Sequence, residues 1–427
     1  MKLNQIAVAV AALAAGVAHA APVTPDLVIK LDGATAVAQS VVDVASFLCK
    51  DGAGAATTKL MSNSADKVSA VYCSAGVKAE SGLPLATKVL VMKNNKDGSL
   101  ETFDRALSRK AQTKLLKVAG LDDTCGTTCA TELVDADGGF SDVDEKIWIG
   151  RNQFDPSLVS GGYTVKAGFA GQGFGIVVTK ALYDAMQLAQ GLDDADDAPG
   201  VNQPNITSQQ FTSILSVTGG YKIDWSPIVG AAGSGMAINL CRRTNASGTQ
   251  ASMDAFFLGN PCLSSAKPTF GALEPAYAAD SAPGEFEVIE NPGTGDVKTC
   301  LSSRNAVADA NQFAIGVMSL ENADSADYKY VKLDGVAPNE EATRRQSVVD
   351  GRYNFAEEMV LAYRNDAPAN VKTYLANFAT VMGDPTKVAA LNGVFVVPGT
   401  STHADFSNRV HKGTRGGNAC QAFQLYE

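Results

Sequence analysis

The feature of this 427-residue sequence that most restricts its fold is a repeated junction of strand, glycine turn and helix. In "LVIKLDGATAVAQSVVDVASFL" (residues 27–48), an apolar run ends at Asp32-Gly33, and valines then recur at helical spacing. The same order returns in residues 89–107 and 237–258. A strand that turns through glycine into a helix opens an α/β unit, so we predict an α/β protein. The length indicates two lobes.

The first twenty residues, "MKLNQIAVAVAALAAGVAHA", contain one lysine, an apolar run, and small residues at Ala18 and Ala20. This arrangement is typical of a secretory signal peptide, which we predict to be cleaved after Ala20. No later segment approaches the roughly 20 apolar residues that a membrane-spanning helix needs. We therefore expect a periplasmic or secreted protein without a membrane span in the mature chain.

The charge and the cysteines narrow the class of partner. A formal net charge of −10 argues against binding to nucleic acid or to anionic lipid. Eight cysteines in an exported chain favour disulfides, although the sequence does not determine their pairing. If cysteines pair with neighbours in the sequence, the expected disulfides are Cys49–Cys73, Cys125–Cys129 and Cys241–Cys262. Cys300 is then left to pair with Cys420.

Several kinds of catalytic or metal site fail on the sequence. Outside the first twenty residues the only histidines are His403 and His411, which we expect to be solvated loop residues. A histidine-centred triad and a zinc site of several histidines are therefore disfavoured. The stretch 135–146 begins like a calcium loop but lacks the required glycine and final carboxylate. We predict no catalytic residue, no metal and no cofactor.

The stretch "RRTNASGTQ" (242–250) combines arginines with small polar residues just before an apolar helical pattern. Asn245 or Ser247 can cap a helix that begins near Thr249. Unbonded amides at that end, together with the helix dipole, form a natural site for an oxyanion. Gly248 lets a ligand approach the backbone. Further donors come from Arg243, Ser247 and Thr249. The alternative interpretation is an ordinary capped surface helix with solvated arginines.

In its wider context this stretch, "RRTNASGTQASMDAFFL", resembles the pattern RRxDGSGTxxxFxxYL of periplasmic phosphate-binding proteins of ABC importers. Weaker similarities follow in the family's order: "DGATA" (32–36), "GGFSDVD" (138–144), "ITSQQFTSILSVTGGYKIDW" (206–225) and "FAIGV" (313–317). The resemblance implies the two-lobed type 2 periplasmic binding protein fold, with a hinge and an interlobe cleft. It also implies a noncatalytic monomer that captures phosphate, or a similar tetrahedral oxyanion, for an ABC importer permease.

The resemblance implies a set of ligand-binding residues: Thr35, Ala36, Gly98, Ser99, Ser141, Asp142, Arg243, Ser247, Gly248 and Thr249. An ionised Asp142 can only accept a hydrogen bond, which monohydrogen phosphate can donate and sulfate cannot. The chain departs from the family pattern at Asn245, where aspartate is usual, and at Ala246, where glycine is usual. In "KDGS" either Asp97 or Ser99 can face the ligand, and we favour the pair Gly98 and Ser99.

We predict that lobe 1 comprises residues 21–165 and 318–427, that lobe 2 comprises residues 166–317, and that hinges lie near 166–175 and 315–319. A rival hypothesis is a ligand-free secreted surface or matrix protein that retains the binding-protein fold. The three departures at Asp97, Asn245 and Ala246 favour this rival. A phosphate-ester hydrolase is disfavoured, because the sequence shows no metal cluster and no base beside a nucleophile.

Overall fold

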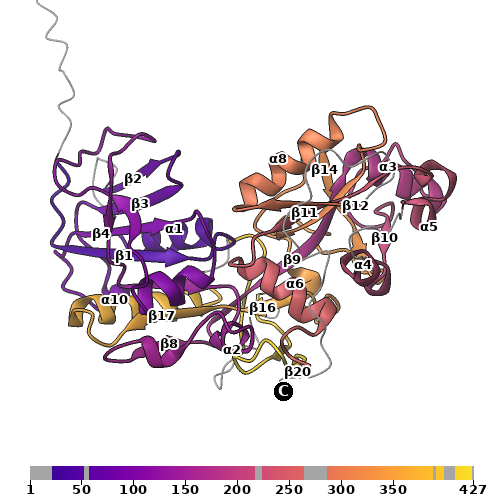
Figure 1. Cartoon of the computed structure of the whole chain (residues 1–427). Helices are drawn as coiled ribbons and strands as arrows, with labels where there is room; N and C mark the ends of the chain where they lie inside the picture. The colour runs from indigo at the N-terminus through magenta and orange to yellow at the C-terminus, as the bar shows by residue number, and fades with distance from the viewer. Residues whose placement is uncertain are drawn as a thin grey trace, which may run out of the picture.

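The computed structural model describes residues 22–51, 57–216, 224–263, 286–387, 391–398 and 409–425. The predicted signal peptide and His403 lie outside these residues. Figure 1 shows two lobes side by side, and the C-terminal part of the chain returns to the lobe formed by the N-terminal part. Among the residues described, no helix has the length and apolar character needed to cross a membrane.

The first lobe is built on a seven-stranded sheet. Its strands, in spatial order, are β2 (Thr58–Asn63), β3 (Val68–Cys73), β4 (Val89–Asn94), β1 (Leu27–Gly33), β7 (Gly138–Ser141), β17 (Val360–Arg364) and β8 (Tyr163–Lys166). Strand β1 is parallel to β4 and β7, whereas β17 is antiparallel to both of its neighbours. Helices α1 (Ala38–Phe47) and α10 (Ala369–Met382) contribute Val41 and Phe378 to the core beneath this sheet.

The second lobe is built on another sheet, in the order β12 (Phe286–Asn291), β11 (Ile238–Arg243), β13 (Ala314–Ser319), β9 (Ala170–Thr179) and β14 (Tyr328–Tyr330). Strand β11 is parallel to β12 and β13, and β9 is antiparallel to its neighbours. The described helices of this lobe are α3 (Lys180–Ala189), α4 (Ser208–Leu215), α5 (Ser226–Val229), α6 (Gly248–Leu258), α8 (Thr294–Asn305) and α9 (Gln346–Val349).

Shorter elements complete the described chain. The strands are β5 (Thr113–Leu116), β6 (Thr131–Val134), β10 (Asn205–Ile206), β15 (Lys332–Leu333), β16 (Ala356–Glu358), β18 (Val394–Val396), β19 (Gly413–Thr414) and β20 (Gln424–Leu425). The helical elements are α2 (Glu145–Gly150), the π-helix η2 (Thr102–Leu107), and the 3₁₀ turns η1 (Ala79–Ser81), η3 (Pro156–Leu158) and η4 (Gly230–Gly233).

The two sheets share one topology. In lobe 1 the order β4-β1-β7-β17-β8 matches β12-β11-β13-β9-β14 in lobe 2, with an antiparallel strand in the fourth place of each. The chain passes from the first sheet to the second between β8 and β9, and it returns to the first sheet between β16 and β17. The α/β class and the two-lobed architecture predicted from the sequence are confirmed, and the type 2 periplasmic binding protein fold agrees with this repeated order.

The second crossing lies later in the chain than predicted. Strands β14 and β16 both pair with β9, and the chain rejoins the first sheet only at β17. The predicted return at residue 318 is therefore wrong, because the second sheet continues beyond it. The predicted hinge at 315–319 lies in strand β13, which is buried, pairs with β9 over this whole range and pairs with β11 at Ile315 and Gly316.

The structure contains four disulfides: Cys49–Cys73, Cys125–Cys129, Cys241–Cys300 and Cys262–Cys420. The first two confirm the predicted pairs, and the predicted Cys241–Cys262 and Cys300–Cys420 bonds are wrong. Helix α6 has 11 residues and carries the chain about 16 Å along its axis away from the end of β11. Helix α8 instead packs back on β11 and brings Cys300 to Cys241.

Candidate anion-binding site

The first turn of α6 lies directly after the end of strand β11. Ser247 is the N-cap, and its Oγ accepts a hydrogen bond from the Gln250 amide at 3.4 Å. The structure thereby selects Ser247 over Asn245, whose side-chain oxygen accepts from Arg242 instead. Ser247, Thr249 and Gln250 are all buried, so this helix end faces the interior of the protein. The surface-helix interpretation is wrong for that reason.

Turns from lobe 1 meet this helix end. A Cβ added to Gly248 would collide with Ser99 Oγ and would lie 2.5 Å from Asp142 Oδ2. The Asp142 amide donates to Ser99 Oγ at 3.1 Å. Nearby, the Leu100 amide donates to the Ala246 carbonyl at 3.0 Å, which joins the two lobes directly. The close approach of the lobes therefore requires glycine at position 248.

Gly98 and Ser99 are the pair that face the other lobe. Gly98 has a φ of 134° and packs against Ala246, and a Cβ there would lie 2.7 Å from the Ala246 oxygen. Asp97 lies apart from them in an ion pair with Arg105 at 2.6 Å and is partly exposed. Of the two residues between which the sequence left a choice, Ser99 lies at the contact between the lobes and Asp97 pairs with Arg105.

Arg243 connects the turn at 33–36, which follows β1, to this site. Its guanidinium is buried and donates to Thr35 Oγ1 at 3.0 Å, across the interface between the lobes. It also donates to Thr294 Oγ1 and to the carbonyls of Asn291 and Pro292. Burial lowers the pKa of Arg243 to about 10, although the Asp142 and Asp296 carboxylates oppose that shift. The group remains a cation at neutral pH.

Asp142 is a buried carboxylate beside these donors. Burial raises its pKa to about 6, whereas Arg243, Lys93, the Ser99 hydroxyl and the Thr249 amide favour its charged form. Its Oδ1 atom has no hydrogen-bond partner, and neither does the buried Oγ1 atom of Thr249. The site therefore holds one unpartnered acceptor and one unpartnered hydroxyl donor. Such atoms are costly to bury without a partner.

The remaining predicted residues differ in position. Ala36 is buried at the turn after β1, and its carbonyl accepts from Ser319 Oγ of lobe 2 at 3.4 Å. Ser141 is buried, but its hydroxyl donates to the Val143 carbonyl at 2.7 Å and accepts from Trp148 Nε1 at 3.3 Å. The Ser141 hydroxyl is thus engaged within lobe 1 and does not join the other groups.

Two charged residues near the site were not predicted. Lys93, at the end of β4, is buried and donates to the Ala34 carbonyl, in the turn at 33–36, at 2.6 Å. Glu321, after β13, accepts from the amide and hydroxyl of Ser40 in α1, so it also joins the lobes. The only sequence signal for Lys93 is a charge at the end of an apolar strand.

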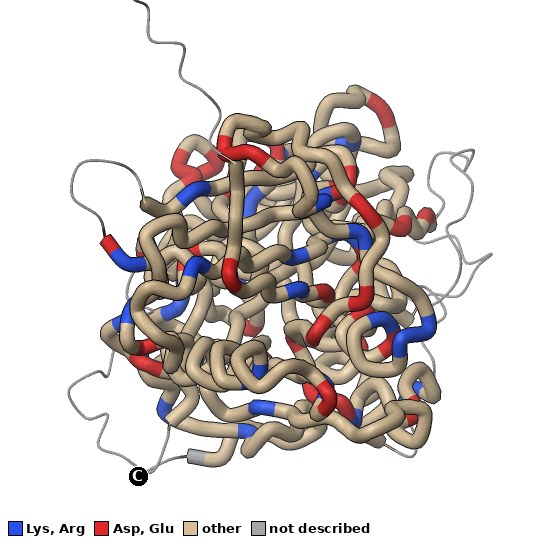
Figure 2. Tube along the Cα trace, turned by 90° about the vertical axis from the view of Figure 1, so that its left-hand side faces the viewer, with Lys and Arg blue, Asp and Glu red and all other residues tan. Residues whose placement is uncertain are grey.

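Further ion pairs hold the lobes together around the site. Arg151, the residue that follows α2, and Asp254 of α6 form a buried pair at 2.9 Å. Lys67 and Asp296 form a more exposed pair at 2.7 Å. Figure 2 shows acidic and basic residues interspersed on the side in view. The positive groups at the candidate site are Arg243, Lys93 and the end of α6, and they lie among the carboxylates of Asp32, Asp142 and Glu321.

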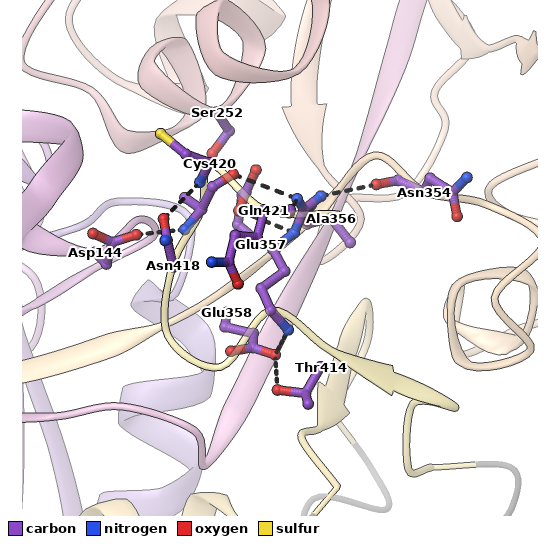
Figure 3. Close-up of polar contacts among 12 residues, drawn as sticks. Asp144, Ser252, Asn354, Ala356, Glu357, Glu358, Thr414, Asn418, Cys420 and Gln421 are labelled. Carbon is purple, nitrogen blue, oxygen red and sulfur yellow. Dashed lines mark hydrogen bonds and ion pairs between the residues drawn. The ribbon is translucent and has the colours of Figure 1, made fainter. Parts of the chain in front are cut away.

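A second buried polar cluster, which we term the Arg415 brace, lies where the C-terminal segment covers β16 (Figure 3). The Arg415 guanidinium donates to four main-chain carbonyls, those of Asn354, Ala356, Ala419 and Gln421. Its Nε atom lies 3.5 Å from Glu357 Oε2. Glu358 accepts from Thr414 Oγ1 and from the amides of Arg415 and Gly417. Asp144 of lobe 1 accepts from the Ala419 amide.

The brace adjoins a pocket of about 320 Å³ lined in part by Phe256, Glu357 and Phe423. The carbonyls already bonded to Arg415 leave its guanidinium little capacity for a ligand there. His411 is also buried in this region, between Phe395 and Phe423, and its Nδ1 bonds with Gly413. The prediction that His411 is a solvated loop residue is wrong, because the two aromatic rings enclose it.

Across the described ranges, no cluster of three or more histidine, cysteine or acidic side chains is placed to hold a metal ion. No family model matches the chain, and no curated protein sequence does either. Among solved structures, the chain is similar to an ABC-type phosphate transport receptor from Vibrio cholerae, with 15% identity and a TM-score of 0.32. That similarity covers 60% of this chain and 78% of the receptor. Similarity at this level does not identify a ligand for this chain.

Proposed function

We propose that this chain is an exported, noncatalytic binding protein that captures inorganic phosphate, or a similar tetrahedral oxyanion, between its two lobes. One observation carries the proposal: Asp142 Oδ1 and Thr249 Oγ1 are both buried and unpartnered at the end of α6. An acceptor and a hydroxyl donor without partners match a ligand that has both a proton to give and oxygens to receive. Monohydrogen phosphate is such a ligand.

The surrounding groups suit the same anion. The N-terminus of α6 and the guanidinium of Arg243 favour negative charge. An ionised Asp142 accepts the phosphate proton, but it would face a sulfate oxygen without a proton between them. A micromolar dissociation constant corresponds to about 8 kcal/mol. Charge-assisted hydrogen bonds contribute roughly 1.5–3 kcal/mol each, so a few donors from both lobes are sufficient.

The burial of the site implies how the ligand enters. Ser99, Asp142, Arg243 and Thr249 are each at most 2% exposed, so an anion reaches them only when the lobes separate. A ligand that contacts both lobes stabilises the closed arrangement over the open one. We propose that closure marks the loaded protein for a membrane importer, which receives the phosphate.

Four disulfides support an oxidising compartment such as the periplasm or the cell exterior. Together with the predicted signal peptide, they support export. We propose that the protein acts there as a monomer, since the lobes already enclose the site within one chain.

A second candidate function is a ligand-free secreted protein that retains the fold. The observation in its favour is that Arg243 already has four protein acceptors. In addition, the Asp142 carboxylate lies against Gly248 at the end of α6, where an external anion would sit. In this alternative Asp142 is a built-in anion that locks the lobes together.

Calorimetry on protein stripped of phosphate by unfolding and refolding separates the two candidates. We expect binding of phosphate in the micromolar range and much weaker binding of sulfate. The double variant Arg243→Ala/Ser247→Ala should lose phosphate binding. Arg352→Ala/Ser213→Ala is the matched control, because it makes the same two changes at exposed positions. If the unaltered protein binds no oxyanion, the ligand-free alternative holds.

A catalytic role is tested on the same protein. We expect nitrophenol release from nitrophenyl phosphate to stay at background with and without added divalent metal. Release above background that disappears in Arg243→Ala/Ser247→Ala would contradict the noncatalytic proposal.

A further inference from the structure

We propose that Lys93 is a positioning residue that strengthens the binding of an anion in this site, acting through the turn at 33–36. This inference rests on the proposed function, because it concerns the same site. Lys93 bonds the main chain of that turn, so it contributes charge and orientation to the site from behind the turn.

The surroundings of Lys93 are unusual for a buried ammonium group. Its side chain is 1% exposed, and Nζ donates to the Ala34 carbonyl at 2.6 Å, to Asn95 Oδ1 at 2.7 Å and to the Asn94 carbonyl at 3.2 Å. All these acceptors are neutral. No ion pair joins Lys93 to a carboxylate within the part of the chain that the structure describes. The charge of Lys93 is therefore solvated by dipoles rather than cancelled.

Three carboxylates face Lys93 at longer range: Asp32 from β1, Asp142 after β7 and Glu321 after β13. Asp32 lies 3.7 Å from Arg105, which is closer to Asp97 and Glu101 and is shared among the three carboxylates. Glu321 accepts from Ser40 and also acts on the nearby Lys298. Lys93 and Arg243 are the two buried cations beside the turn at 33–36, and the carboxylates that act on Lys93 are Asp32, Asp142 and Glu321.

The positive charge of Lys93 favours an anion in the adjacent site. The N-termini of α1 and α6 each add about half a positive charge. An unpaired buried cation is costly, so an anion that enters the site also relieves the cost of burying Lys93.

Removal of the Lys93 charge should weaken dianion binding. At an effective dielectric constant near 20, one charge acting on a dianion over about 10 Å corresponds to on the order of a hundredfold in affinity. We expect a loss of this size for phosphate in Lys93→Met near pH 8. Lys59→Met is the matched control, because Lys59 lies in the same sheet but pairs with Asp123 at the surface. The control should bind like the unaltered protein.

A pH profile distinguishes a charge effect from a packing effect. Burial lowers the pKa of Lys93 to about 8, so the ligand-free protein loses this proton as the pH rises through that value. Above pH 8 phosphate stays doubly charged and Asp142 stays ionised, so neither of them titrates. Phosphate affinity of the unaltered protein should therefore decline from about pH 8 to about pH 9. Lys93→Met should bind weakly and without this decline.

Lys93→Arg keeps the proposal testable if the methionine variant does not fold, since arginine stays charged across this range. It should retain phosphate binding without the alkaline decline. Unchanged affinity in folded Lys93→Met, or the same decline in Lys93→Arg, would overturn the role of Lys93 alone. No phosphate binding by the unaltered protein at any pH would overturn the proposed function as well.

Discussion

The candidate anion site and the Arg415 brace both place a buried arginine beside a buried carboxylate, yet they differ in how their polar atoms are satisfied. In the brace, Arg415 Nε and Glu357 Oε2 make no hydrogen bond, but they face each other 3.5 Å apart in an ion pair. In the anion site, Asp142 Oδ1 and Thr249 Oγ1 are unpartnered and belong to opposite lobes.

The difference separates a structural cluster from a binding cluster. The charged groups of the brace are satisfied within the protein, since Arg415 donates to main-chain carbonyls and Glu358 accepts from main-chain amides. In the anion site the Thr249 hydroxyl donor and the Asp142 acceptor have no hydrogen-bond partner, and a ligand can supply both partners. Substitutions in the brace should therefore change stability without binding, and substitutions in the anion site should change binding more than stability.

The largest expected effect on stability is in the brace. Arg415→Met should lower the free energy of unfolding by about 3–5 kcal/mol, because Glu357 and several carbonyls lose their buried partner. Urea unfolding measures this change. Arg352→Met is the control, since the exposed pair of Arg352 with Glu340 is worth less than about 1 kcal/mol. Loss of phosphate binding without loss of stability would reverse the roles given to the two clusters.

The next effect concerns the disulfide that fastens the brace to lobe 2. Cys262→Ser/Cys420→Ser opens a link between residues 158 positions apart and should cost about 2–4 kcal/mol of unfolding free energy. Cys125→Ser/Cys129→Ser is the control and should cost less, because it spans only 4 positions. Phosphate affinity should not change in either variant. A fall in affinity confined to the first would mean that the brace shapes the site.

Asp142→Asn should raise the stability of the ligand-free protein at pH 8. The rise of the Asp142 pKa from 3.8 to about 6 corresponds to about 2–3 kcal/mol, present below pH 4 and lost as the pH rises through about 6. Asparagine has no such titration, so the gain should vanish near pH 4. Urea unfolding at both pH values tests the sign.

The same substitution should change specificity, because the asparagine amide can donate to sulfate. The ratio of phosphate to sulfate affinity should fall relative to the unaltered protein. A ratio that stays the same would show that Asp142 does not discriminate between the two anions.

Thr249→Val should have the smallest effect on stability. Removal of an unpartnered buried hydroxyl should leave the ligand-free protein as stable or about 1 kcal/mol more stable. Phosphate affinity should fall about tenfold or more, because one donor is lost. Thr299→Val on the exposed face of α8 is the control. A clear loss of stability in Thr249→Val would show that the hydroxyl stabilises the fold and would contradict its role as a free donor for the ligand.

The fold was predictable as far as its signals are local. Strand, glycine and helix lie within about twenty residues of each other, so β1-α1 and β11-α6 could be recognised directly. The return point could not, because it depends on β17 pairing between β7 and β8 from about two hundred residues away. The disulfides divide in the same way. The pairs Cys49–Cys73 and Cys125–Cys129 were predicted correctly, whereas the local pair Cys241–Cys262 was wrong because the position of α8 and of the C-terminal segment decides both partners.

The site was predictable where one helix end determines it. Ser247, Gly248 and Thr249 follow from capping and from the close approach at glycine. Lys93 and Glu321 were missed because their burial is set by the packing of sheets and lobes, which no short pattern encodes. Arg415 was missed since its partners lie about sixty residues earlier in β16.

The place of β17 also dictates the order in which the lobes can be completed as the chain emerges from its N-terminus. Strand β8 pairs only through β17, so the sheet that begins first stays open until residue 364 has appeared. By then β9 to β16 of the other lobe are already present. The main body of that lobe can thus form before the first sheet is closed, and β18 joins β9 only afterwards.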